Sequence, residues 1–81
     1  MNIYIGNLNY QVSESQVFDL LEEFGEVKSA KLIIDRETGR SKGFAFVEMA
    51  NAESAERAIK ELAGKDFEGR SLVVREAKPR A

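Results

Sequence analysis

The segment 43–49 is the part of this 81-residue chain that most constrains its fold. Its side chains alternate with a period of two, which predicts a β-strand. One face of that strand would carry Ala45, Val47 and Met49, and the other Phe44, Phe46 and Glu48. Apolar side chains therefore lie on both faces, so a single covering layer leaves two Phe rings to be explained.

Five further elements follow from local patterns. Strands are predicted around residues 3–5, at 27–34 and at 72–77, because these segments are rich in β-branched residues. Helices are predicted at 14–24 and 52–63 from apolar residues at helical spacing. Ser13 and Gln16 match a capping box, Asn51 suits an N-cap, and Phe67 is placed at the start of a short hairpin.

The order β-α-β-β-α-β predicts an α+β fold, the ferredoxin-like split βαβ sandwich. Its four-stranded antiparallel sheet would be covered by two helices on one face. The predicted core face of the sheet comprises Ile3, Ile5, Ala30, Leu32, Ile34, Ala45, Val47, Met49, Leu72 and Val74. Phe18 is expected to pack at the edge of that core.

The opposite face should meet water, yet it contains large apolar side chains. By alternation it carries Tyr4, Phe44, Phe46, Ile33 and Val73, together with Asn2, Lys31, Lys42 and Arg75. An exposed apolar patch of this kind marks a binding site. Aromatic rings among cations suit single-stranded nucleic acid, since bases stack on the rings and cations hold the phosphates.

The net charge of −2 and the pI near 5.2 hide an uneven distribution. The predicted helices hold seven acidic and two basic residues, whereas the rest of the chain holds seven acidic and ten basic residues. The chain contains no His and no Cys, which excludes Ser-His-Asp and Cys-His catalysis and cysteine zinc sites. We expect no metal, no cofactor and no small-molecule substrate.

Two segments carry a family resemblance. Residues 42–49, Lys-Gly-Phe-Ala-Phe-Val-Glu-Met, resemble the octamer of RNA-recognition motif domains at seven of eight positions, and 3–8 resemble the companion hexamer. The exception, Met49, faces the predicted core. The resemblance covers about residues 2–78, so we expect a domain at 1–78 and a tail at 79–81. It is closest to small single-domain RNA-binding proteins of bacteria and cyanobacteria and to plant glycine-rich RNA-binding proteins.

The resemblance implies a role for individual residues. Tyr4 and Phe46 would each stack on a base, Phe44 would pack against sugars, and Lys42 would contact phosphate. The backbone at Ala77 and Lys78 lies where such domains hydrogen-bond to bases. We further expect Lys31 and Arg75 to neutralise phosphates, with Asn2 on the same face and Arg40 in the loop before the octamer.

The predicted function is non-catalytic binding of single-stranded RNA by a monomer, in post-transcriptional regulation or RNA chaperoning. The sequence does not distinguish RNA from single-stranded DNA as the ligand. The alternative function is that of a protein-binding domain with the same fold. An acylphosphatase-type hydrolase is disfavoured, because the loop 6–10 has no basic residue for a phosphate. No apolar run reaches 18 residues and no signal peptide is evident, so we expect a cytoplasmic protein without membrane contact.

Overall fold

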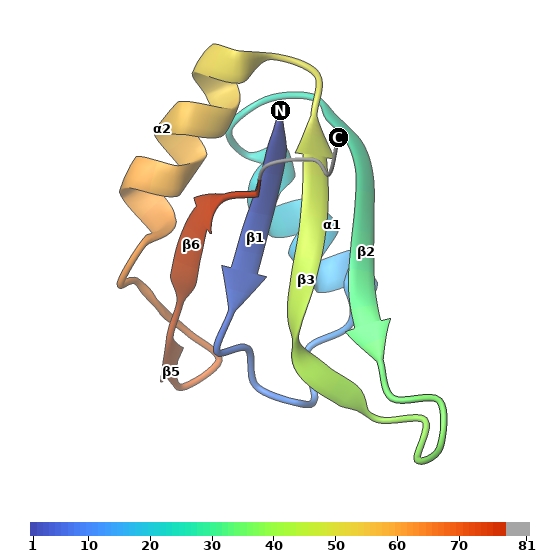
Figure 1. The fold of residues 1–81 in the computed structure, drawn as a ribbon. Helices are drawn as coiled ribbons and strands as arrows, with labels where there is room; N and C mark the ends of the chain where they lie inside the picture. The colour runs from blue at the N-terminus through green and yellow to red at the C-terminus, as the bar shows by residue number, and fades with distance from the viewer. Residues whose placement is uncertain (78–81) are drawn as a thin grey trace.

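The computed structural model describes residues 1–77, which form a four-stranded sheet covered by two helices, and a small separate hairpin (Figure 1). The main elements are β1 (Asn2–Gly6), α1 (Glu14–Glu22), β2 (Val27–Ile34), β3 (Ser41–Met49), α2 (Ala52–Leu62) and β6 (Val73–Glu76). The four long strands pair antiparallel in the order β2-β3-β1-β6. This confirms the predicted α+β split βαβ sandwich.

A separate two-stranded hairpin links α2 to β6. It consists of β4 (Asp66–Phe67) and β5 (Arg70–Ser71), and it confirms the hairpin expected at Phe67. This hairpin lies at the end of the sheet where β1 leads into the loop before α1 (Figure 1). Two segments far apart in the sequence therefore meet at this end of the molecule.

The core lies between the sheet and the helices. Ile3 and Ile5 of β1 are fully buried against the apolar sides of both helices, and Ala55 and Ala58 allow α2 to approach the sheet closely. Burying a branched aliphatic side chain of this size contributes about 1.5–3 kcal/mol. Phe18 is half-buried and packs against this core, as expected.

Both helices begin where the sequence places their caps. The Ser13 hydroxyl accepts a hydrogen bond from the Gln16 amide at 3.2 Å, and the Gln16 side-chain oxygen accepts from the Ser13 amide at 2.9 Å. The Asn51 side chain accepts from the amide of Glu53 at 2.8 Å. The first helix ends at Glu22, two residues before the predicted end, because its last residues leave helical geometry in a turn.

One predicted core residue is wrong: Ile34 is 45% exposed. The pairing of β2 with β3 shifts between Leu32, which faces Ala45, and Ile34, which faces Ser41. The extra residues on β3 form an irregularity around Gly43, whose φ is +84°. Ile34 keeps the same side as Leu32, but at the end of β2 it borders an open cavity that also involves Tyr10 and Arg40, so its side chain stays exposed.

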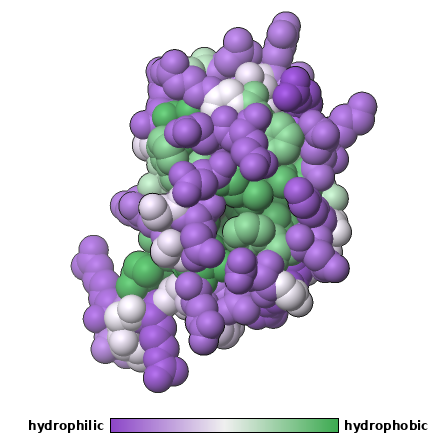
Figure 2. Space-filling model, turned by 180° about the vertical axis from the view of Figure 1, so that it is seen from behind, coloured by the Kyte–Doolittle hydropathy of each residue, from purple (hydrophilic) through white to green (hydrophobic). Residues whose placement is uncertain are grey.

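The helical side of the molecule is mainly hydrophilic. Figure 2 views the molecule from behind and shows polar side chains surrounding a central apolar area. Acidic residues on this side include Asp19 and Glu22 of α1 and Glu56 and Glu61 of α2, all exposed. Neither helix in residues 1–77 is long and apolar enough to cross a membrane.

Candidate nucleic-acid interface

The open face of the sheet carries a row of four side chains, one from each strand. Strand pairing aligns Lys31 of β2 with Phe46 of β3, Phe46 with Tyr4 of β1, and Tyr4 with Arg75 of β6. Directly opposite residues in an antiparallel sheet place their side chains on the same face and in contact range. The row therefore runs cation, aromatic, aromatic, cation across the whole sheet.

Three aromatic rings form a cluster at the centre of this face. The ring centres of Tyr4 and Phe46 are 5.7 Å apart, those of Tyr4 and Phe44 are 5.9 Å apart, and those of Phe44 and Phe46 are 6.1 Å apart. Phe46 is 41% exposed, while Tyr4 and Phe44 are half-buried. The rings support one another at angles that leave parts of each surface open to a planar ligand.

The Tyr4 ring occupies space that is free only because residue 6 is glycine. A Cβ atom placed on Gly6 would lie 2.5 Å from the Tyr4 hydroxyl oxygen and 2.8 Å from a carbon of the Tyr4 ring. The phenol therefore lies directly over Gly6, two residues along β1. Only a residue without a side chain leaves that space free.

The strand end next to Tyr4 holds two further predicted residues. The amide of Ala77 donates a hydrogen bond to the carbonyl of Asn2 at 2.9 Å, so this amide is already used within the protein. Glu48 faces Asn2 across the β1–β3 pair and adds one carboxylate to the open face. Lys78 lies outside the described residues.

The predicted cations Arg40 and Lys42 lie at the other end of β3. Both are exposed, and both line a cavity of about 450 Å³ that also involves Phe44 and Tyr10. The structure thus brings Lys42 next to the aromatic cluster, whereas Arg40 lies beyond it, in the loop before β3.

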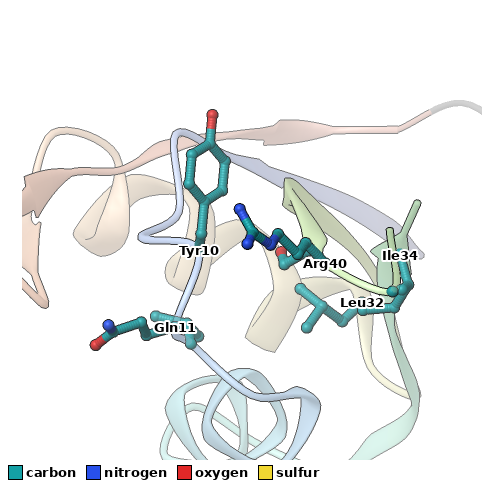
Figure 3. Close-up of a pocket in the computed structure, with 8 residues that line it drawn as sticks. Tyr10, Gln11, Leu32, Ile34 and Arg40 are labelled. Carbon is teal, nitrogen blue, oxygen red and sulfur yellow. The ribbon is translucent and has the colours of Figure 1, made fainter. Parts of the chain in front are cut away.

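Sequence reasoning missed Tyr10 as a surface residue of interest. It is 64% exposed in the loop between β1 and α1, and it lines cavities that it shares with Leu32, with Lys42 and with Arg70. Figure 3 shows one of them, about 500 Å³ in volume, with Leu32 and Ile34 on one wall and Arg40 extending towards the Tyr10 ring. An aromatic residue just after the hexamer was the available signal.

Within residues 1–77, no ion pair involves the cations of the open face. The ion pair that the described part of the chain does form, Arg57 with Glu61 at 3.5 Å, lies on α2. Residues 1–77 contain no group of three or more acidic side chains that could hold a metal ion. The chemistry of this face is therefore stacking and charge attraction.

A β-α-β-β-α-β sandwich with aromatic side chains on the two central strands of its open face defines an RNA-recognition domain. The RNA recognition motif family matches residues 3–73. The chain belongs to the RNA recognition motif family, a family of non-catalytic RNA-binding domains.

Several individual proteins and solved structures are similar to this chain over most of their length. The putative RNA-binding protein RbpD of Nostoc sp. is 49% identical over 80 residues, which are 99% of this chain and 85% of that protein. The crystal structure of RNA binding protein PG1 has a TM-score of 0.96 and 56% identity, covering 100% of this chain and 98% of that one. The structure of the Rna15 RRM with bound RNA (GU) has a TM-score of 0.88 and 35% identity, covering 96% and 83%. The expected likeness to small cyanobacterial RNA-binding proteins is confirmed.

Proposed function

We propose that this protein binds single-stranded RNA on the open face of its sheet. Two neighbouring bases stack on Tyr4 and Phe46, and Phe44 packs against the sugars between them. Lys31 and Arg75 contact phosphates at the two edges of the sheet. The observation that carries the proposal is the row across the four strands, with its two aromatic rings between two cations.

The affinity of such a face can be bounded. Three aromatic contacts at about 1–3 kcal/mol each give about 3–9 kcal/mol before the cost of association. Immobilising both partners removes several kcal/mol, so a dissociation constant on the order of micromolar is expected. About three phosphate contacts, with Lys42 as the third, give a slope near −2 when the logarithm of affinity is plotted against that of salt concentration.

We propose RNA rather than DNA as the ligand because similar proteins are described as binding RNA. The Rna15 RRM, which is similar in structure, is described with bound RNA (GU), and the cyanobacterial relative is named as an RNA-binding protein. We extend this to a monomeric domain at 1–78 followed by a tail at 79–81, acting on cytoplasmic RNA. Post-transcriptional regulation or RNA chaperoning is the corresponding role.

The proposal is tested by titrating ¹⁵N-labelled protein with short single-stranded RNAs of random sequence at low salt. Amide shifts centred on Tyr4, Phe44, Phe46 and Arg75 are the expected result. Phe46→Ala should weaken binding by about 1–3 kcal/mol and leave the fold intact, because the ring is partly exposed.

Phe24→Ala is the matched control, since Phe24 is half-buried at the end of α1 and packs against the helical side of the core. It should lower the melting temperature and leave RNA affinity unchanged. An absence of shifts on the sheet while the fold stays intact would reject the proposal in favour of a protein partner, and shifts confined to the helices would place the RNA on the other side of the molecule. The same titration with single-stranded DNA establishes whether the 2′-hydroxyl contributes.

A further inference from the structure

The proposed RNA-binding face, called the platform below, consists of Tyr4, Phe44, Phe46, Lys31, Lys42 and Arg75. Tyr10 is a large exposed aromatic side chain outside this platform. It is 64% exposed, more than Phe46 at 41%. An aromatic ring that remains so exposed contributes little to the stability of the fold. Three features of its surroundings point to a ligand.

The first feature is that the Tyr10 loop is fixed rather than free. The Asn7 side-chain amide donates to the Ser71 carbonyl at 2.7 Å, and that of Asn9 donates to the Glu68 carbonyl at 3.1 Å. These bonds join the loop to the β4–β5 hairpin. The hairpin in turn places the Arg70 guanidinium 5.9 Å from the centre of the Tyr10 ring.

The second feature is the surface on which Tyr10 rests. A Cβ atom on Gly43 would lie 3.1 Å from a Tyr10 ring carbon and 3.2 Å from the Leu8 carbonyl oxygen. The Leu8 amide also donates to the Gly43 carbonyl at 2.8 Å. The ring is therefore seated against bare main chain of β3, directly beside Lys42 and Phe44 of the platform.

The third feature is charge. Arg40, Lys42 and Arg70 each line a cavity that Tyr10 also lines, and no carboxylate within residues 1–77 forms an ion pair with any of them. Figure 3 shows Arg40 and Tyr10 extending into the same space. Asp35 also borders one of these cavities, and one of its carboxylate oxygens accepts from the Glu37 amide at 2.8 Å. Three cations around an exposed ring favour an anionic, planar ligand.

We propose that Tyr10 and Arg70 form an additional nucleotide-binding subsite that continues the RNA path beyond Phe44. A base stacks on Tyr10, and Arg70 and Lys42 contact the flanking phosphates. A cavity of about 200 Å³, bordered by Tyr4, Phe44, Lys42, Tyr10 and Arg70, connects the subsite to the platform. This inference rests on the proposed function, because it assumes that the strand lies across the sheet.

The test compares two RNA lengths on the same variants. A dinucleotide that fills Tyr4 and Phe46 has no base left for Tyr10, whereas an octanucleotide can reach all three rings. Tyr10→Ala should lower octanucleotide affinity about tenfold, as loss of one stacked base does, and leave dinucleotide affinity unchanged. Tyr10→Phe keeps the ring and should stay within about twofold of the parent. Arg70→Ala should also weaken only the octanucleotide.

The outcomes separate this subsite from the platform itself. If Tyr10→Ala leaves both lengths unchanged while Phe46→Ala weakens both, the subsite is rejected and the platform stands. If Tyr10→Ala weakens both lengths equally, Tyr10 acts through the position of Gly43, and the subsite is again rejected. If Phe46→Ala affects neither length, the proposed function itself fails.

Discussion

The guanidinium of Arg75 lies 4.7 Å from the centre of the Tyr4 ring, and the two residues are directly opposite each other in the β1–β6 pair. A cation over an aromatic face gains about 0.5–1 kcal/mol at an exposed site. In the free protein, Arg75 therefore covers part of the ring that the proposed function assigns to a base. RNA binding would require it to move from the ring to a phosphate.

Arg75→Ala should consequently have two opposing effects on RNA affinity. It removes a phosphate contact, which lowers affinity most at low salt, and it uncovers the Tyr4 ring, which does not depend on salt. We expect the log–log salt slope to fall by about 0.7 and the loss of affinity to shrink as salt rises. Fluorescence anisotropy across a salt series measures both. Arg57→Ala on α2 is the control, and an Arg75→Ala slope equal to the parent slope would contradict the assignment.

Glu48 places a carboxylate on the open face, across from Asn2. At about 8 Å in water-like surroundings, its repulsion of one phosphate charge is about 0.5 kcal/mol. Glu48→Gln should therefore raise RNA affinity about twofold at low salt, with no gain at high salt. Glu56→Gln on α2 changes the net charge equally. If both variants bind more tightly to the same extent, the effect is global charge rather than the position of Glu48.

Gly6→Ala tests whether the position of the Tyr4 ring matters. The new methyl group would force the phenol away, since the two would otherwise be 2.5 Å apart. The Tyr4 ring is half-buried and can swing outward, so we expect a small change in melting temperature and a loss of RNA affinity of about 1 kcal/mol. Calorimetry of unfolding and of RNA binding measures the two separately. Unchanged affinity would show that the displaced ring still stacks.

Gly43→Ala should destabilise the fold. The left-handed φ of +84° costs a non-glycine residue about 1–2 kcal/mol, and the new Cβ atom would also press on Tyr10 and on the Leu8 carbonyl. Gly39→Ala is a close control, because Gly39 has a similar φ of +73° and no neighbouring atom within 4 Å. Urea denaturation should show a larger loss of unfolding free energy for Gly43→Ala. Equal losses would mean that the contact with Tyr10 adds no strain.

Local patterns in the sequence were sufficient to predict the main helices and strands and to assign most side chains to one face of the sheet or the other. The caps at Ser13 and Asn51, the strand Val27–Ile34 and the exposure of Phe46 all follow from patterns a few residues long. Periods of two and 3.6 are properties of the backbone itself, so they can be read without knowing which strands pair. The octamer and the hexamer each lie on one strand, so the resemblance to the family could also be read from short stretches of sequence.

Only the tertiary structure decided which side chains meet. The row from Lys31 to Arg75 depends on the registers of three strand pairs, and the exposure of Ile34 depends on the open cavity that it borders with loop residues such as Tyr10. Tyr10 lies beside Arg70 because hydrogen bonds such as that of Asn7 with Ser71 join segments 64 residues apart. Register and loop contacts of this kind arise from packing between distant segments, and no short stretch of sequence contains them.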